Sequence, residues 1–307
     1  MWFKNLYFFA FTRPFELSEQ DLEKHLSEHL FTPLGSTELA HFGWVNALGK
    51  HGHSPVHSAN GNFLICARKE EKILPAPVIK DMVEEKVNQL EQDQGRGATK
   101  KEKEQFKEDI IFELLPRAFS RITDTHAYIS PANNIIVINS SSRGKAEDLL
   151  ALLRKVIGTL PVTSFDPDIC VDETMTDWLN EKSLGGNFTL GMEAEFNALG
   201  DDGAVVRVKN QDLIGEEIKA HLDADKYVVK VALEWDESLS FILCDDLAIK
   251  RVKFFDVIHE QNDDIDSDDV VAKLDADFAL MAGELNRFII ELLAEFSMKT
   301  TDHLEKD

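Results

Sequence analysis

Residues 78–114 contain two helix-forming stretches joined by a polar junction, and this segment constrains the fold more than any other part of the chain. In the first stretch, four apolar residues fall on one side of a helix: Ile79, Val83, Val87 and Leu90. The junction, residues 91–104, is polar and contains Gly95 and Gly97, which favour a bend. Because a polar tip has nothing to bury in a hydrophobic core, we predict a helical hairpin whose base packs and whose tip projects as an arm.

The bend and the return helix of this hairpin carry a dense group of cations. Thr99 and Glu102 have the spacing of a capping box, which predicts that the return helix begins just after Thr99. The cations are Arg96, Lys100, Lys101, Lys103 and Lys107, and three of the lysines share one helix face. For any single lysine, a solvated face balanced by Glu102, Glu104 and Glu108 is the simplest interpretation. Several such groups on one surface would instead attract an anion.

The acidic excess of the chain disappears in the same region. The 307 residues carry a net charge of −23, yet residues 68–121 contain 12 basic and 12 acidic residues, whereas residues 122–307 contain 17 basic and 38 acidic ones. Net negative charge repels phosphate, but screening limits exposed charges to a range of about 8 Å at physiological ionic strength. Two classes therefore stay open: an acidic protein that binds a basic partner, and a protein that gathers its cations on one surface.

The rest of the sequence predicts an α+β protein with antiparallel sheets and flanking helices, since no βαβ alternation is present. Residues 161–200 are interrupted by proline and glycine and predict an irregular boundary region with a short helix near Met175–Leu179. The other expected elements are a strand at 2–12, a helix at 18–29 capped by Ser18, a hairpin turn at Asn60-Gly61, two strands within 127–138, a helix at 146–157, a helix near 215–222, and a meander of strands at 227–235, 239–243 and 249–255.

We divide the chain into four segments: an N-terminal α+β unit (1–74), the projecting helical hairpin (75–121), an α/β central segment (122–200), and a C-terminal meander with a long helix (201–307). The long helix carries an apolar seam formed by Val271, Leu274, Phe278, Met281, Leu285, Phe288 and Leu292. Such a seam fits either self-association or core packing. We favour core packing, because the seam is short and contains bulky phenylalanines.

Several other features bear on compartment and chemistry. Three widely spaced cysteines, Cys66, Cys170 and Cys244, encode neither a disulfide framework nor a zinc site, which favours a reducing cytoplasm. No apolar run approaches the roughly 20 residues that span a bilayer. Phosphate-loop, dinucleotide-binding and nucleophile-elbow motifs are absent from the sequence, so we expect no enzyme activity, no catalytic residue and no cofactor.

Two clusters resemble metal sites only superficially. His51, His53 and His57 lie in a Gly/Pro-rich segment without an acidic or thiol partner nearby, so we do not expect a metal there. Five aspartates, Asp263, Asp264, Asp266, Asp268 and Asp269, lack the spacing of a calcium-binding loop. Acidic residues before a helix are explained better by the helix dipole.

Unusual sequence motifs extend through nearly the whole chain. They are MWFKNL and TRPFEL near the start, FGWV and LGKHG within Phe42–Gly52, RKEEKILPAPVIKD at Arg68–Asp81, LLPRAFSR at Leu114–Arg121, and LGMEAE at Leu190–Glu195. On these motifs the chain resembles the bacterial recombination-associated RdgC family. The resemblance implies a non-enzymatic protein that encircles duplex DNA as a ring-shaped homodimer, binds it without sequence preference, and limits strand exchange driven by RecA. It also implies a cytoplasmic, nucleoid-associated location.

The resemblance assigns expected roles to particular residues. DNA contacts are expected from cations of the hairpin and the flanking segments: Lys69, Lys72, Arg96, Lys100, Lys101, Lys103, Lys107, Arg117 and Arg121. Further groups of cations occur at Arg143-Lys145, Arg154-Lys155, Arg207-Lys209 and Lys250-Arg251-Lys253. Ring closure is expected from Phe119 within LLPRAFSR, together with Asn210 and Gln211. Asn210 replaces a lysine of the family, which puts a charge-assisted contact in doubt at that position.

Two other functions are weighed against the DNA ring. The first is an acidic regulator that contacts a recombinase directly, with DNA binding incidental. The second is a metal-dependent hydrolase that uses the histidine cluster, which we consider remote. For Phe119 the alternative role is that of an ordinary core residue, as for most lone aromatic side chains.

Overall fold

Antiparallel strand pairing organises the chain, as expected for the α+β class. The computed structural model describes residues 2–167, 169–181, 184–198, 200, 203–262, 265 and 269–304, and these contain eight α-helices. The chain forms two units. Unit 1 comprises Met1–Glu28, Asn46–Cys66 and Thr125–Asp307, and unit 2 comprises His29–Val45 and Ala67–Asp124. The division into four consecutive segments stays a prediction.

The sheet of unit 1 follows the order β5-β6-β1-β12-β11-β10-β8-β9, with β7 beside β1 and β3 paired with β4. Its strands are β1 (Leu6–Phe11), β3 (Val56–Ala59), β4 (Asn62–Lys72), β5 (Ser120–Ser130), β6 (Ile135–Asn139), β7 (Val162–Ser164), β8 (Phe188–Ala198), β9 (Val205–Lys209), β10 (Lys226–Trp235), β11 (Leu239–Cys244) and β12 (Ile249–Phe254). β4 and β5 continue into unit 2. The register pairs large apolar residues across strands, for example Leu233 with Phe241 and Phe8 with Val137. Such pairs on one face stabilise a sheet.

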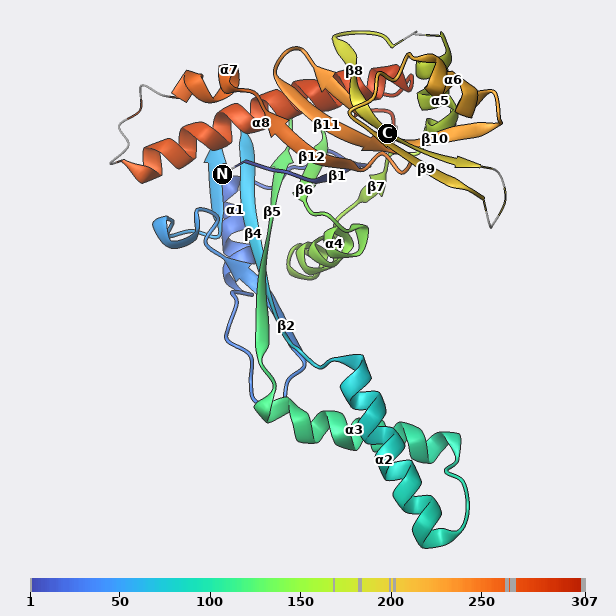
Figure 1. The fold of residues 1–307 in the computed structure, drawn as a ribbon. Helices are drawn as coiled ribbons and strands as arrows, with labels where there is room; N and C mark the ends of the chain where they lie inside the picture. Colours follow the sequence, from blue (N-terminus) through green and yellow to red (C-terminus); the bar gives the residue numbers. More distant parts are fainter. Residues whose placement is uncertain are drawn as a thin grey trace. The chain divides into compact units, whose positions relative to one another are not determined.

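The core of unit 1 forms where its longest helix packs on the sheet. Unit 1 contains α1 (Glu19–Ser27), α4 (Arg143–Ile157), α5 (Val171–Glu181), α6 (Glu216–Leu222), α7 (Asp256–His259) and α8 (Val270–Glu295). In Figure 1, α8 runs across the strands β10, β11 and β12. Phe288 of α8 is fully buried, and its ring centre lies 4.7 Å from that of Phe241 and 5.7 Å from that of Trp235. The preference for core packing over self-association is therefore confirmed for the middle of the seam, whereas Val271 at its start is exposed.

Capping residues and a tight turn fix the ends of several elements at or near the predicted positions. The Ser18 hydroxyl accepts a hydrogen bond from the Asp21 N–H and caps α1. Asn60 and Gly61 both adopt positive φ, as a tight turn between β3 and β4 requires. Asp269 caps α8 by accepting from the Ala272 N–H at 3.0 Å. The aspartates at 263, 264, 266 and 268 lie outside the described residues.

For residues 161–200 the predicted short helix is confirmed within α5, but the expectation that the rest of the region is irregular was wrong. This region contains α5 and the 11-residue strand β8, which pairs with β10 on one side and β9 on the other. The β8–β10 ladder contains two register shifts, and Gly191 lies so close to Ala232 that an added Cβ would come within 2.9 Å of the Ala232 side chain. Bulges and a glycine interrupt the two-residue period by which a strand is recognised in a sequence.

Unit 2 combines β2 (Ala40–Val45) and its parts of β4 and β5 with α2 (Ala76–Gln94), α3 (Lys100–Leu114) and a short 3₁₀ turn at Leu115–Arg117. α2 ends at Gly95, whose φ of 65° is the left-handed conformation that glycine favours. The predicted capping box at the start of α3 is confirmed, with hydrogen bonds in both directions between Thr99 and Glu102. No residue of α2 is fully buried, and α3 buries only Ile110. The projecting arm itself stays a prediction.

In the described part of the chain, no helix is both long and apolar enough to cross a membrane.

Candidate nucleic-acid interface

A protein that binds nucleic acid without sequence preference needs cations that can reach phosphates. Three surfaces hold most of the cations proposed from the sequence: the α2–α3 pair of unit 2, the paired strands β4 and β5 in unit 2, and an open face of the sheet in unit 1. Arg143, Lys145, Arg154 and Lys155 lie apart from them on α4. The three surfaces differ in how many of their charges are already neutralised.

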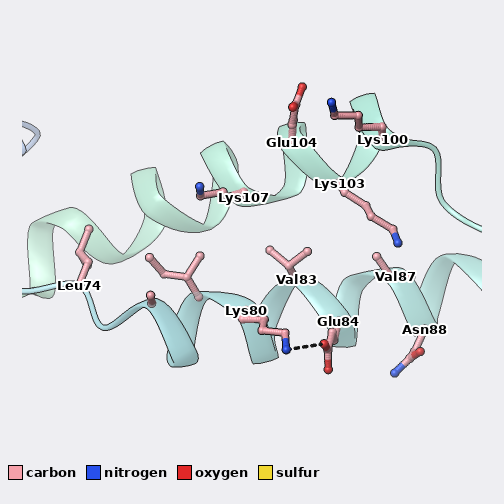
Figure 2. A pocket seen from close by; sticks show the side chains of 12 residues that line it. Leu74, Lys80, Val83, Glu84, Val87, Asn88, Lys100, Lys103, Glu104 and Lys107 are labelled. Atoms are coloured by element: carbon pink, nitrogen blue, oxygen red, sulfur yellow. Dashed lines mark ion pairs between the residues drawn. The ribbon is translucent and has the colours of Figure 1, made fainter. Parts of the chain in front are cut away.

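Three lysines of α3 line a groove against α2. Lys100, Lys103 and Lys107, here called the α3 lysines, are exposed, and the groove encloses about 860 Å³. Figure 2 shows Lys103 directed across the groove toward Val87 on α2. Within the described residues, the α3 lysines and the neighbouring Lys101 have no carboxylate partner. Their charges are therefore available to an external anion.

The opposite wall of this groove is apolar. It is formed by the α2 residues Ile79, Val83 and Val87, here called the apolar wall, and Leu74 extends it. In Figure 2, Val83 and Val87 point from α2 toward α3. All three residues of the apolar wall are only half-buried. The stripe predicted from the sequence is thus present on α2, but the described residues do not cover it.

Arg96, at the bend, is committed to an internal ion pair. Its guanidinium donates to both Glu102 carboxylate oxygens, at 2.9 and 2.6 Å. These bonds, with those from Thr99, lower the pKa of Glu102 to about 2, and the pKa of Arg96 is raised in turn. Glu102 also completes the capping box, so this pair joins the bend to the first turn of α3. Any contact of Arg96 with DNA would compete with this structural role.

The cations of β4 and β5 are mostly paired as well. Arg68 forms a bidentate ion pair with Asp124, both distances being 2.7 Å. Arg121 pairs with Glu71, and the Lys72 ammonium donates to the Ala118 carbonyl at 3.1 Å. The Lys69 ammonium lies 6.0 Å from the centre of the Phe42 ring. Arg117, which follows α3, is exposed and has no carboxylate partner among the described residues.

Phe119 lies outside the hydrophobic core. Its side chain is 85% exposed, while its backbone carbonyl accepts a hydrogen bond from the Ile73 N–H at 2.8 Å. Ile73 and Ile122 are also about half exposed, at 48% and 55%. The core alternative for Phe119 is therefore wrong. A solvent-exposed aromatic side chain on a hydrogen-bonded backbone is typical of a contact with another molecule.

Asn210 and Gln211 follow β9 in unit 1. Asn210 has a φ of 52°, a left-handed conformation that asparagine tolerates better than most residues. The Gln211 N–H donates to the Met192 carbonyl at 3.2 Å. Backbone geometry thus fixes both residues at an exposed strand end, and their part in ring closure stays a prediction.

Sequence reasoning found only pieces of the third surface. Five cations from β9, β10 and β12 surround two carboxylates of β8 in a hollow of about 300 Å³, and we call this set the sheet-face cluster. Its charged residues are Arg207, Lys209, Lys230, Lys250, Arg251, Glu193 and Glu195. The net charge of these seven residues is +3, on a protein whose overall charge is −23. The sequence shows two of these pairs, but Lys230 joins them only through strand pairing.

The carboxylates of the sheet-face cluster orient its cations. Glu195 accepts from the Arg207 guanidinium at 2.7 Å and from the Lys230 ammonium at 2.9 Å, and Glu193 pairs with Arg251. Burial opposes ionisation of Glu195, but the bonds from Arg207 and Lys230 hold its pKa below the ordinary value. The bond from Arg251 lowers the pKa of Glu193 in the same way.

The histidine cluster does not form a metal site. His57 bonds to Asp275 at 2.8 Å, and the described residues contain no group of three or more His, Cys, Asp or Glu side chains that could hold a metal ion. The metal-dependent hydrolase is therefore not supported by the residues that first raised it.

Comparison with known proteins gives a consistent result. The family model described as "Putative exonuclease, RdgC" matches residues 1–299. The chain is 91% identical over 307 residues to the recombination-associated protein RdgC of Colwellia psychrerythraea, covering 100% of both chains. It is 53% identical over 294 residues to the protein of the same name from Tolumonas auensis and 54% identical over 294 residues to that from Aeromonas hydrophila, covering 96% of this chain and 97% of each relative.

Proposed function

This chain belongs to the RdgC family of recombination-associated proteins, and from that premise we propose that it binds duplex DNA without sequence preference and catalyses no reaction. The observation that carries the proposal is the set of α3 lysines. They are exposed, unpaired within the described residues and gathered along one helix, whereas Arg68, Arg96 and Arg121 of the same unit are matched by carboxylates. Lysines without internal partners can displace the counterions of DNA and bind any sequence.

The proposed DNA-contacting residues are Lys69, Lys72, Arg96, Lys100, Lys101, Lys103, Lys107, Arg117 and Arg121. Arg117 and the four lysines of α3 are expected to contribute most, because Lys72, Arg96 and Arg121 already have partners within the protein. The sheet-face cluster adds a second cationic surface. Since phosphate contacts position a protein without reading bases, this chemistry suits binding along any duplex.

We further propose that two copies close into a ring around the duplex and so restrict access of RecA. The exposed Phe119, with Asn210 and Gln211, would form the closing contact. A small contact centred on one aromatic side chain can open, which a ring that loads onto DNA requires. The proposed location is the nucleoid, in the cytoplasm.

A salt titration tests the DNA proposal directly. If about six phosphates are neutralised, the logarithm of the affinity should fall with the logarithm of salt concentration at a slope of about −5. Replacing Lys100, Lys101, Lys103 and Lys107 with alanine should weaken binding similarly on unrelated duplexes and flatten the slope. The matched control removes four exposed lysines elsewhere, Lys24, Lys50, Lys219 and Lys299, and should leave the slope nearly unchanged. Equal slopes for the two variants would remove α3 from the interface.

The family description also names an exonuclease, and this can be tested separately. We expect end-labelled duplex and single-stranded DNA to stay intact with the purified protein and Mg²⁺ or Mn²⁺, at protein concentrations that saturate the DNA. Release of nucleotides that tracks the protein through purification would contradict the non-enzymatic part of the proposal.

One observation favours a second candidate, a regulator that contacts the recombinase directly: residues 122–307 hold 38 acidic residues against 17 basic ones. Such a surface suits a basic protein partner. If RecA is retained by the immobilised protein when DNA is absent, while duplex binding is undetectable at low salt, this second function should replace the first.

A further inference from the structure

The groove between α2 and α3 has walls of opposite chemistry. One side is the apolar wall of α2, and the other holds the α3 lysines. Lys80 of the lining is paired with Glu84 at 3.7 Å. The remaining charged residues of the lining are the three α3 lysines and Glu104, so the groove carries a net positive charge. A duplex would use only the lysines, because a phosphate backbone has no apolar surface to place on Val83 and Val87. The apolar wall therefore calls for a different occupant.

The spacing of the two walls indicates the shape of that occupant. Residues of the apolar wall recur at intervals of four along α2, and the α3 lysines recur at intervals of three and four. Each row spans about two helical turns, or about 12 Å at 1.5 Å per residue. A helix lying in the groove presents side chains at these same intervals. An extended chain, whose side chains alternate every second residue, would not match them.

We infer that this groove is a docking site for an acidic amphipathic helix of a partner protein. The apolar side chains of that helix would cover Ile79, Val83 and Val87, and its Asp and Glu side chains would pair with Lys100, Lys103 and Lys107. Charge complementarity selects an acidic partner, and the half-buried apolar wall selects an amphipathic one. This role goes beyond DNA binding, yet it draws on the same lysines, so the partner and DNA would compete for α3.

The test uses a fluorescent synthetic helix of about 15 residues with leucines at alternating spacings of three and four and glutamates elsewhere. Its affinity for the full-length protein is measured by anisotropy. Two control peptides replace either the leucines with serine or the glutamates with lysine. We expect the leucine–glutamate peptide to bind and both controls to bind at least about tenfold more weakly, since each lacks one of the two complementary features.

Protein variants separate this site from the DNA interface. V83Q/V87Q removes apolar surface and replaces it with glutamine, a good helix former. This variant should lower the affinity for the peptide about tenfold and leave the affinity for duplex DNA unchanged. Replacing Lys103 and Lys107 with alanine should lower the affinity for both the peptide and duplex DNA. The matched controls V78Q and K86A alter α2 residues that do not line the groove, and neither should change peptide affinity.

Three results would overturn the inference: no binding of the leucine–glutamate peptide to the wild-type protein, a serine peptide that binds as tightly, or a V83Q/V87Q variant that loses duplex and peptide together or loses neither. The first two results, and the loss of neither ligand by V83Q/V87Q, do not require that the protein binds duplex. A protein that fails to bind duplex but retains the peptide through Val83 and Val87 would refute the proposed function and leave this site standing.

Discussion

The two longest helices of the chain, α8 in unit 1 and α2 in unit 2, have opposite relations to the protein that carries them. α8 has 26 residues and buries ten of them, whereas α2 has 19 residues and buries none. Tertiary packing therefore stabilises α8, while α2 depends on its own propensity, on the glycine that ends it and on half-buried contacts. Most of the stabilising burial therefore lies in unit 1, whereas unit 2 keeps apolar and cationic side chains available for other molecules.

Truncation of a core aromatic in α8 should give the largest effect. Phe288→Ala removes a fully buried ring that contacts Trp235 and Phe241, and should lower the free energy of unfolding by about 3–5 kcal/mol. Val83→Ala in α2 is the paired variant, with an expected loss below about 1 kcal/mol because the side chain is only half-buried. Urea denaturation followed by circular dichroism measures both. Equal losses would break the contrast between the helices.

A smaller loss is expected from the polar network that joins α8 to the sheet. Buried Asn286 accepts from the Tyr128 hydroxyl at 3.0 Å and donates to Asn62 and Ser130, both at 3.1 Å. Asn286→Ala leaves the buried Tyr128 hydroxyl without its acceptor, while Ser130 keeps the bond from the Asn133 amide at 2.9 Å, and the change should cost about 1–3 kcal/mol.

A double-mutant cycle sharpens that prediction. Tyr128→Phe removes the hydroxyl that Asn286 accepts from, so combining it with Asn286→Ala should cost less than the sum of the single losses. Strict additivity in urea denaturation would show that the two side chains do not act as a unit.

Acid should loosen the start of α3, where Glu102 pairs with Arg96. The pKa of Glu102 is lowered from 4.5 to about 2 by the bonds from Arg96 and Thr99. A lowered pKa in the folded state means that the stabilisation is present above pH 4.5 and is lost as pH falls toward 2. Amide hydrogen exchange at Thr99–Glu102 should therefore speed up across this window, after correction for the intrinsic rate. Glu102→Gln should remove most of the pH dependence. Protection that stays constant to pH 2 would show that the ion pair is not formed.

The smallest change in stability is expected at Phe119. Because its side chain is 85% exposed, Phe119→Ser should change the free energy of unfolding by less than about 0.5 kcal/mol. Association of two copies and retention on closed circular DNA should nevertheless weaken, as seen by analytical ultracentrifugation and gel shift. Unchanged association would remove Phe119 from the proposed closing contact.

Features set by neighbours in the chain could be predicted from the sequence. The caps at Ser18 and Thr99, the turn at Asn60-Gly61 and the β10–β12 meander depend on short-range geometry, and the structure has them where they were expected. The strand β8 was missed because its bulges and Gly191 disrupt alternation, and its identity depends on pairing with β10 and β9. Long-range pairing has no local signature.

In the candidate site too, residues grouped by local spacing could be predicted, whereas residues brought together by folding could not. The helical spacing of the lysines on α3 was visible in the sequence, since a helix face is a local property. The sheet-face cluster was visible only as separate pairs, because Arg207, Lys230 and Arg251 meet through strands that are distant in sequence. The internal partners of Arg96 and Arg121 were also not evident, because opposite charges six or fifty residues apart form pairs only after folding.

The carboxylates within the sheet-face cluster order its cations before any anion binds. Glu195 and Glu193 already hold Arg207, Lys230 and Arg251 in fixed directions, so a bound oxyanion would immobilise few side chains that are not already ordered. The unpaired lysines of α3 offer full charge without such orientation. The first surface should discriminate by fit, through guanidinium geometry, whereas the second should accept any anion in proportion to its charge density.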